Sequence, residues 1–307
     1  MTSKNRGITL LLLAVLLWGP NPVITVVTLQ QIPPLSLGFF RLAFAAVIAA
    51  VFFIPRGYLR IQRKDIPVFI LIGLFGSSLN MAFFLFGLQH TTAMTAQAIF
   101  TATPVFTAIF AYLILKERIQ LVQVIGVAIG LAGSLFIALR AFFETGNFED
   151  GSLFGNGLIF VSLLMWVAYI LISKNLSERY SPFTLTGFVF IFGGLSFIPL
   201  AVWENMQIGI DWVDAVTLGG VLGVVYQGAV ASFIAFIAYQ IGLQLTTAFA
   251  AGVVLYLGPV VTTAFAVPVL GETITWPFVI GVLLIISGSF VATQHEFVVR
   301  KLRKKQG

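Results

Sequence analysis

One basic residue, Arg41, lies well inside a long apolar segment, eight residues after Pro33. Burying a guanidinium in a bilayer costs about 2.5–3.5 kcal/mol on insertion scales, so a charge in such a segment is by default a functional residue. A guanidinium facing a cavity can bind a carboxylate through two parallel hydrogen bonds. The alternative is a structural role, in which Arg41 bonds helix-end carbonyls or extends toward the membrane surface.

Two sets of four residues follow the spacing of one helical face, in which neighbours are three or four residues apart. The first set is Met94, Gln97, Thr101 and Pro104, and the second is Phe249, Gly252, Tyr256 and Pro259. Each proline removes a backbone donor and frees a carbonyl four residues upstream. Such a broken helix is tolerated where it lines a cavity or where neighbours satisfy the freed groups. Cavity lining and polar contact between helices therefore both remain open for these faces.

A further set of aromatic and polar residues lies near the centres of apolar segments: Trp18, Asn21, Asn80, Trp166, Tyr169 and Tyr226. Aromatic residues at the ends of membrane helices usually form an interfacial belt, whereas central ones can form cavity walls. Each polar member can alternatively hydrogen-bond a neighbouring helix. Together with Arg41, Gln97, Thr101 and Tyr256, these are the candidate substrate-binding residues, and Pro104 and Pro259 are candidate helix breaks.

The composition shows what kind of elements must hold these residues. Of 307 residues, 59% are hydrophobic and only 9% are charged, and the mean hydropathy is +1.04. A soluble domain carries roughly a quarter charged residues, so this chain has too little charge for a water-facing surface. The 31 phenylalanines exclude disorder. The lack of cysteine excludes disulfides, thiolate metal sites and cysteine nucleophiles. The chain is an all-α polytopic membrane protein.

A bilayer core of about 30 Å needs about 20 apolar residues per helix. Ten segments meet this length: 7–29, 33–54, 66–88, 92–115, 120–139, 155–173, 182–203, 214–240, 245–269 and 276–295. They leave short connectors and no room for a soluble domain. The first segment follows Lys4 and Arg6 but lacks a small-residue cleavage site, which indicates a retained helix.

The basic residues give the orientation of these spans. With the N-terminus inside, 15 of the 17 Lys and Arg fall on inner segments, whereas only Arg140 lies in an outer loop and Arg41 within a span. Lys and Arg accumulate on the cytoplasmic side of membrane proteins, so both termini are predicted to be cytoplasmic. Because the net charge of +6 comes from these flanks and the tail 300–305, the expected surroundings are a lipid bilayer, and nucleic acid is not an expected partner.

The chain contains an internal repeat. Residues 87–134 align without a gap with residues 242–289, and 21 of these 48 positions are identical. At a slightly different shift, Trp18 aligns with Trp166 and 34–37 with 182–185. The predicted units are 1–140 and 150–307, with five spans each. Because five is odd, the units must cross the membrane in opposite senses, as inverted-topology repeats. Such repeats are typical of secondary transporters, which hold substrate near mid-membrane at the repeat interface and alternate in access.

Two smaller features of the repeats are a pair of equivalent glutamates and a pair of closely spaced glycines. Glu117 and Glu272 end equivalent spans, and we expect them to cap the following helix, because a carboxylate is stabilised near helix N–H groups. The spacing of Gly126 and Gly130 allows close helix contact, which we interpret as internal packing. A monomer is therefore expected, with a dimer as the alternative.

These motifs together resemble the EamA-type branch of the drug/metabolite transporter superfamily. The features that carry the resemblance are Trp18-Gly19, Arg41, Pro104, Leu115-Lys116-Glu117-Arg118 and Gly126, Gly130 and Gly133, partly repeated as Pro259, Leu270-Gly271-Glu272, Gly281 and Gly288. The resemblance implies a bacterial-type inner-membrane exporter of amino acids or similar metabolites, like the YddG-like exporters of aromatic and neutral amino acids. Val167 and Val189 depart from the pattern at the positions equivalent to Gly19 and Arg41.

Several other functions fit the sequence less well. Span centres carry no Asp or Glu, which argues against proton-coupled export of cationic drugs and favours facilitated export. A membrane enzyme needs clustered carboxylates on a metal, or a nucleophile with its base, and the chain shows neither pattern, so we expect no catalysis, cofactor or metal. Nucleotide-sugar carriage would require several cavity cations.

The sequence therefore predicts a secondary transporter that exports a small molecule, with neutral or aromatic amino acids as the expected class. The alternatives are other metabolites or drugs of the same superfamily and a passive channel, because polar-lined helix bundles also conduct.

Overall fold

The computed structural model describes residues 3–115, 121–139 and 150–303, which are helices joined by short turns, without a strand in these ranges. The ten predicted spans correspond in order to α1 with α2 (Ser3–Trp18 and Asn21–Leu29), α3 (Pro34–Phe53), α4 with α5 (Ile66–Gly73 and Leu79–Leu88), α6 with α7 (Ala93–Phe100 and Thr103–Leu115), α8 (Leu121–Ala138), α10 (Asp150–Leu176), α11 (Pro182–Ile208), α12 with α13 (Leu218–Val225 and Ala235–Leu245), α14 with α15 (Ala248–Val254 and Gly258–Leu270) and α16 (Trp276–Arg303).

Some span ends differ from the prediction. The eighth span starts at Leu218 and not at 214, because Asp211–Ala215 forms a separate, mostly exposed 3₁₀ turn that contains two aspartates. The seventh span continues past 203 to Ile208, where Gly209 has a φ of +79°. Glycine adopts this positive φ without the steric cost that a side chain would bring, and the helix ends here.

The surface of the bundle is suited to lipid. Within the described residues, seven helical segments are long and apolar enough to cross a bilayer, and Val124–Ile137 and Trp276–Gly288 are shorter apolar helices. The fourth span is divided into α6 and α7 at Thr101 and Ala102. Large apolar side chains such as Leu113 and Leu283 are exposed on the outside. The protein is a multi-pass membrane protein.

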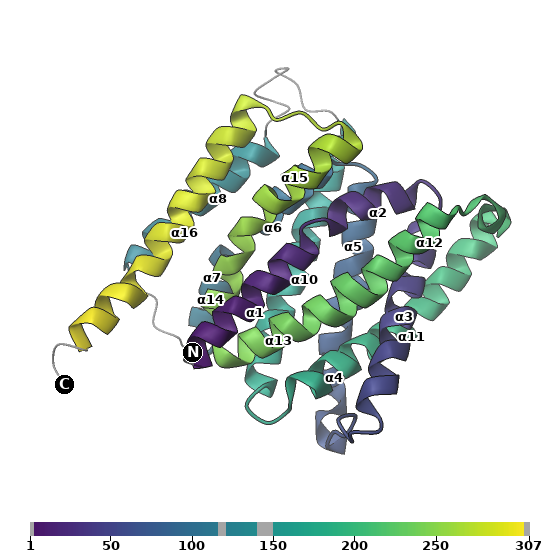
Figure 1. Cartoon of the computed structure of the whole chain (residues 1–307), viewed down its shortest axis with the longest axis horizontal. Helices are drawn as coiled ribbons and strands as arrows, with labels where there is room; N and C mark the ends of the chain where they lie inside the picture. The colour runs from purple at the N-terminus through teal and green to yellow at the C-terminus, as the bar shows by residue number, and fades with distance from the viewer. Residues whose placement is uncertain (1–2, 116–120, 140–149, 304–307) are drawn as a thin grey trace.

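Helices of the two halves pair in a symmetric pattern. The first span packs through α1 on α13 of the eighth, and the equivalent pair is α10 of the sixth on α5 of the third. The second and fifth spans instead pack on their own equivalents, α3 on α11 and α8 on α16, and the last pair forms one edge of the molecule in Figure 1. Exchanging the two halves therefore leaves the set of helix pairs unchanged.

Glycine contacts show the same symmetry at atomic scale. A side chain on Gly87 would meet Ile159 and the carbonyl of Gly155, whereas one on Gly242 would meet Leu11 and the carbonyl of Gly7. Gly87 and Gly242 are repeat equivalents, and so are the two pairs of residues they face. The halves are thus related by a pseudo-two-fold axis. Because each half has five spans, this axis lies in the membrane plane and the repeats are inverted.

The helices are interrupted at equivalent places near the centre of the molecule. The third and eighth spans contain π-helical turns, η2 (Leu74–Ser78) and η4 (Tyr226–Ile234). The fourth span breaks at Thr101, and the ninth contains the 3₁₀ turn η5 (Leu255–Leu257). Both breaks lie just before Pro104 and Pro259. Because π-helical turns are frequent at functional sites, these interruptions point to the middle of the bundle.

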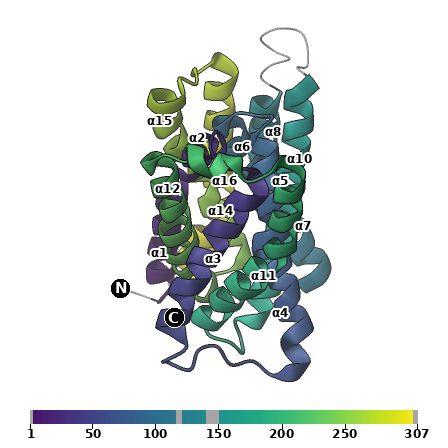
Figure 2. The ribbon, with the colours of Figure 1, turned by 90° about the vertical axis from the view of Figure 1, so that its right-hand side faces the viewer.

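The start of α1 and the end of α16 lie at the same end of the bundle, which we call the terminal end (Figures 1 and 2). The turns at 54–62 and 177–181 lie at this end. The turns at 30–33, 89–92, 209–217 and 271–275 lie at the opposite, distal end.

Candidate functional site: a central cavity between the repeats

A cavity of about 100 Å³ lies between the two repeats. By the same measure a single water needs about 10–15 Å³, so the cavity accommodates a small solute. Twelve residues line it: Trp18, Asn21, Arg41, Gly76, Asn80, Met81, Phe84, Gln97, Phe100, Trp166, Phe236 and Leu255. They come from the first, second, third, fourth, sixth, eighth and ninth spans, so both halves contribute to the wall.

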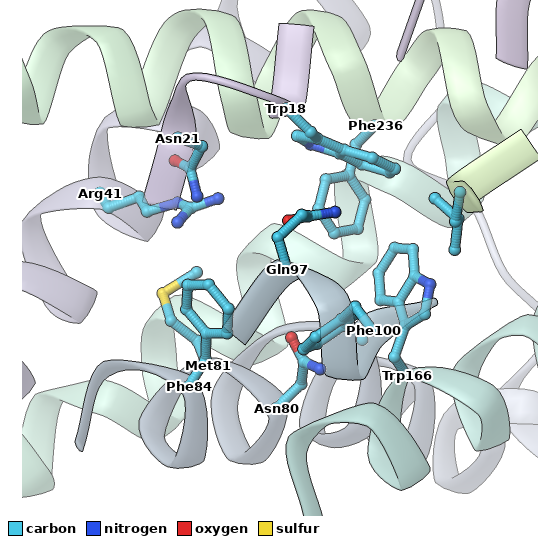
Figure 3. Close-up of a pocket in the computed structure, with 12 residues that line it drawn as sticks. Trp18, Asn21, Arg41, Asn80, Met81, Phe84, Gln97, Phe100, Trp166 and Phe236 are labelled. Atoms are coloured by element: carbon cyan, nitrogen blue, oxygen red, sulfur yellow. The ribbon is translucent and has the colours of Figure 1, made fainter. Parts of the chain in front are cut away.

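The cavity has a polar and an aromatic side (Figure 3). Arg41 and Asn21 lie together on one side, and the rings of Trp18, Phe236 and Trp166 lie on the other. Gln97 projects between them. The rings contact one another, with 5.5 Å between the centroids of Trp18 and Trp166 and the same distance between those of Trp166 and Phe236. A solute with a charged end and an apolar body matches this division.

Arg41 is held by the opposite repeat. Its Nε donates to Ser232 Oγ at 2.8 Å, and Ser232 belongs to the π-helical turn η4. In the equivalent place, Ser77 of η2 donates to the backbone carbonyl of Val189, the counterpart of Arg41, at 3.1 Å. Arg41 therefore bonds neither helix-end carbonyls nor the membrane surface. Among the described residues, its two Nη groups have no hydrogen-bond partner, and the guanidinium lines the cavity.

Two side-chain amides of the lining also keep free groups. Asn21 is only 7% exposed, and its Oδ1 has no hydrogen-bond partner in the described part of the chain. The amide of Gln97 likewise has no partner there. Asn80 differs, because its Nδ2 donates to the carbonyl and the hydroxyl of Ser162 on α10. Asn80 thus has the helix-bridging role that was its alternative, while still lining the cavity.

Six of the ten predicted binding residues line the cavity, and four lie outside its lining: Thr101, Tyr169, Tyr226 and Tyr256. Thr101 bonds the backbone carbonyl of Ala98 in its own helix. Tyr226 donates to the carbonyl of Leu17 at 2.7 Å, which joins the eighth span to the first. Tyr256 is buried, with no hydrogen-bond partner for its hydroxyl among the described residues.

Tyr169 belongs to a polar network on the terminal side of the cavity. Its hydroxyl donates to Gln240 Oε1 at 2.8 Å, and Ser173 exchanges hydrogen bonds with the same amide. One turn further, Lys174 donates to the carbonyl of Leu243 at 2.8 Å, and Gln244 to that of Ser177 at 2.9 Å. The sixth and eighth spans are thus joined from the cavity to the terminal end.

Among the described residues, the positions equivalent to this network do not repeat it, and on the distal side Thr25 donates instead to Gln227 Oε1 at 3.1 Å, which joins the first span to the eighth. The positions equivalent to Tyr169 and Tyr239 are Asn21 and Phe84, which line the cavity, whereas the two tyrosines do not. The counterpart of Gln240 is Leu85, which cannot bridge. The cavity is therefore displaced from the pseudo-two-fold axis toward the distal end.

Sequence reasoning missed six lining residues: Gly76, Met81, Phe84, Phe100, Phe236 and Leu255. Some signals were present. Gly76, Asn80 and Phe84 are four residues apart and share a helical face. Met81 is the repeat equivalent of Phe236, and Phe100 of Leu255. Extending each polar face by one turn and adding its repeat equivalent would have found most of them.

The carboxylate of Glu272 caps a helix, but not the one that was predicted. Its oxygens accept from the backbone N–H groups of Ala93 and Met94 at 2.9 and 3.2 Å, at the start of α6 in the other half. The expectation that it caps the following helix is wrong, because the inverted packing places Glu272 beside α6. Its counterpart Glu117 lies outside the described residues. Glu204, which no prediction singled out, caps α3 in the same way through Leu35 and Ser36.

The sequence model of the EamA-like transporter family matches residues 5–139 and 153–294. These two matches cover most of the chain. The chain belongs to the EamA-like transporter family. Similar proteins include an uncharacterized transporter of Clostridium kluyveri, which is 29% identical over 80% of this chain and 78% of its own length. The uncharacterized transporter YetK of Bacillus subtilis is 27% identical over 89% and 82%. An uncharacterized transporter of Archaeoglobus fulgidus is 26% identical over 96% and 100%.

A solved crystal structure of another protein has the same fold. Its TM-score is 0.70 at 22% identity, and the match covers 95% of this chain and 96% of that one. The fold and the EamA-like family together identify this chain as a membrane transporter.

Proposed function

We propose that this EamA-like transporter exports small metabolites that carry a carboxylate and an apolar body, with neutral or aromatic amino acids as the expected substrates. The carboxylate would bind the Nη groups of Arg41, and the apolar body would lie against Trp18, Trp166 and Phe236. The observation that carries this proposal is the guanidinium without a carboxylate partner in the cavity. A bidentate pair with a substrate carboxylate would satisfy it.

Alternating access is the mechanism that the symmetry supports. Two inverted repeats can exchange conformations, which yields one state open to each side of the membrane. In the described conformation, hydrogen bonds around Gln240 join the sixth and eighth spans on the terminal side of the cavity, and Thr25 and Gln227 join the first and eighth spans on the distal side. A passive channel would need a continuous polar path through the bundle, and the buried hydrogen bonds that tie the sixth span to the eighth around Gln240 support a carrier instead.

The direction of transport follows from the predicted orientation. The basic residues favour termini on the cytoplasmic side, which would make the distal end extracytoplasmic and the protein an inner-membrane exporter. No acidic residue lines the cavity, which supports facilitated export down the substrate gradient over export coupled to protons.

The test is a counterflow assay with the purified protein in liposomes. Vesicles loaded with unlabelled phenylalanine should accumulate labelled phenylalanine transiently above equilibrium, which a carrier produces and a channel does not. A panel of labelled amino acids extends the assay. If no member of the panel is taken up, the proposed substrate class is wrong, and uptake without an overshoot would favour the channel.

Arg41→Gln tests the residue at the centre of the proposal. Losing a bidentate charged pair should reduce phenylalanine counterflow by about tenfold or more, because hydrogen bonds to charged groups are worth about 1.5–3 kcal/mol. The matched control is Arg60→Gln, on the exposed turn at the terminal end, which should transport normally. Normal folding of Arg41→Gln with unchanged transport would contradict the role of Arg41.

A further inference from the structure

The charges around the cavity do not balance. Arg41 is the one charged residue among the twelve that line it, and none of the twelve is acidic. The buried or half-buried carboxylates Glu204, Glu272 and Asp65 are engaged elsewhere, since the first two cap helices at the distal end and Asp65 pairs with Arg179 at the terminal end. The walls of the site therefore carry one positive charge, in surroundings that are mostly aromatic.

This charge distinguishes between substrates of different net charge. A zwitterionic amino acid brings a carboxylate for Arg41 and also an ammonium that finds no carboxylate partner. The free amide oxygens can accept hydrogen bonds from it, but they do not neutralise it. Moving an unpaired ion out of water carries a large desolvation penalty. A monoanion of the same shape brings the carboxylate alone and makes the loaded cavity neutral.

We propose that the site prefers monoanionic carboxylates to zwitterions, and that the protein is an electrogenic exporter of aromatic or apolar organic acids. This inference rests on the proposed function, because it assigns the substrate class of the same cavity. The transported species carries one negative charge, and no residue of the lining is an acid that could carry a compensating proton. An inside-negative membrane potential then drives the substrate outward, which agrees with the predicted direction.

The first experiment compares three ligands of one shape with different charge. Phenylalanine is zwitterionic, 3-phenyllactate replaces its ammonium by a hydroxyl and is a monoanion, and phenethylamine lacks the carboxylate and is a cation. Each competes with labelled phenylalanine in counterflow by the unchanged protein. We expect 3-phenyllactate to inhibit at an about tenfold lower concentration than phenylalanine, because an unpaired ammonium costs at least that much affinity. Phenethylamine should not inhibit.

Two variants test whether Arg41 causes the preference for the monoanion. In Arg41→Gln, the advantage of 3-phenyllactate over phenylalanine should disappear, whereas Arg41→Lys, which keeps the charge, should retain most of it. Should Arg41→Gln fail to fold, the comparison of ligands on the unchanged protein still decides the proposal.

The second experiment measures the transported charge. Labelled 3-phenyllactate is equilibrated across proteoliposomes under a potassium diffusion potential set with valinomycin, with protein-free liposomes as the leak control. For a single negative charge, a potential of about 59 mV corresponds to a tenfold concentration ratio. At that potential, inside negative, the vesicles should hold 3-phenyllactate at one tenth of its external concentration. Labelled phenylalanine should reach equal concentrations.

The outcomes separate the two proposals. If phenylalanine is transported but 3-phenyllactate inhibits no better than phenylalanine, or its distribution ignores the potential, the inference is wrong and the proposed function stands. If neither phenylalanine nor 3-phenyllactate is transported, the proposed function itself fails.

Discussion

Ser232 connects Arg41, the proposed binding group in the first repeat, to the π-helical turn η4 in the second. Its hydroxyl accepts the Nε–H of Arg41, so the guanidinium is oriented by the eighth span while its Nη groups face the cavity. Because Ser232 lies in a π-helical turn, a change in that turn would move the guanidinium. In the proposed mechanism, this one hydrogen bond would link substrate binding to rearrangement of the repeat interface.

Ser232→Ala should weaken transport without removing the charge of Arg41. Loss of a hydrogen bond to a charged group corresponds to about 1.5–3 kcal/mol, so the KM for the transported substrate should rise by about tenfold or more. Ser77→Ala is the matched control, since Ser77 is the repeat equivalent and bonds a backbone carbonyl, not Arg41. Equal effects of the two substitutions on KM in the liposome assay would show that Ser232 does not position the guanidinium.

At the residue scale, the sequence could identify unusual residues but not their partners. Arg41 was recognisable because it is a cation in an apolar span. Whether its guanidinium meets carbonyls, lipid headgroups or a hydroxyl depends on a serine 191 positions away in the chain. Tyr226 and Tyr169 were equally recognisable, yet each is engaged by a neighbouring helix. Spacing along one helix cannot predict such contacts, because they are set by packing between helices.

Close packing of α8 on α16 depends on glycines from both halves. A Cβ on Gly288 would lie 2.5 Å from the carbonyl oxygen of Gly126 and from the nitrogen of Gly130. Gly133 faces Gly281 in the equivalent way. These contacts join the two repeats at the edge of the bundle, which agrees with the internal-packing interpretation of the glycine spacing.

Gly288→Val should separate α8 from α16 and destabilise the protein. Overpacking of this kind typically costs about 1–3 kcal/mol, which should lower the midpoint of thermal unfolding in detergent. The control is Gly157→Ala on α10, where an added Cβ meets nothing within 4 Å. That change should leave the midpoint unchanged or raise it slightly, because alanine favours the helix by up to about 1 kcal/mol. Equal midpoints for the valine variant and the parent would contradict the close approach.

The network around Gln240 predicts which side of the membrane reaches the cavity. The chain has no native cysteine, so Gln97→Cys offers a single thiol in the cavity. An impermeant reagent should label it faster from the distal side. Adding Tyr169→Phe removes one neutral hydrogen bond, worth about 0.5–1.5 kcal/mol, and should raise labelling from the terminal side by about two- to tenfold.

Tyr58→Phe is the matched control for this measurement. The Tyr58 ring packs against Phe53 and Phe183 near the terminal end, and its hydroxyl has no hydrogen-bond partner in the described part of the chain. Its removal should leave labelling unchanged. Faster labelling from the terminal side in the parent protein would contradict the asymmetry of the cavity.

At the element scale, the sequence predicted where the spans lie better than it predicted the irregular turns within them. Prolines and polar residues marked the breaks in the fourth and ninth spans. The π-helical turns carried no comparable signal, because Leu74–Ser78 and Tyr226–Ile234 contain no proline and their Gly, Ser and Gln residues also occur in regular membrane helices. They arise where the third and eighth spans pack against spans of the other repeat. Only the assembled bundle determines that geometry.

The whole molecule follows from duplication of an odd number of spans. Identical residues in the two halves meet equivalent partners, as with Gly87 and Gly242, so the sequence repeat predicted a symmetric bundle with a shared interface. The cavity departs from this symmetry because equivalent positions now hold different residues, Asn21 opposite Tyr169 and Phe84 opposite Tyr239. In the proposed mechanism, the pseudo-symmetry would supply two access states, and these differences would set which one is favoured.

The most direct test of the account is the sidedness of one pair of repeat equivalents. Gln30 and Glu178 are exposed and lie at the distal and the terminal end. As single cysteines in right-side-out cells, Gln30→Cys should react with an impermeant thiol reagent, and Glu178→Cys should react only after the membrane is opened. Reaction of both cysteines from the same side would contradict the inverted repeats, and with them the shared cavity on which the proposed transport depends.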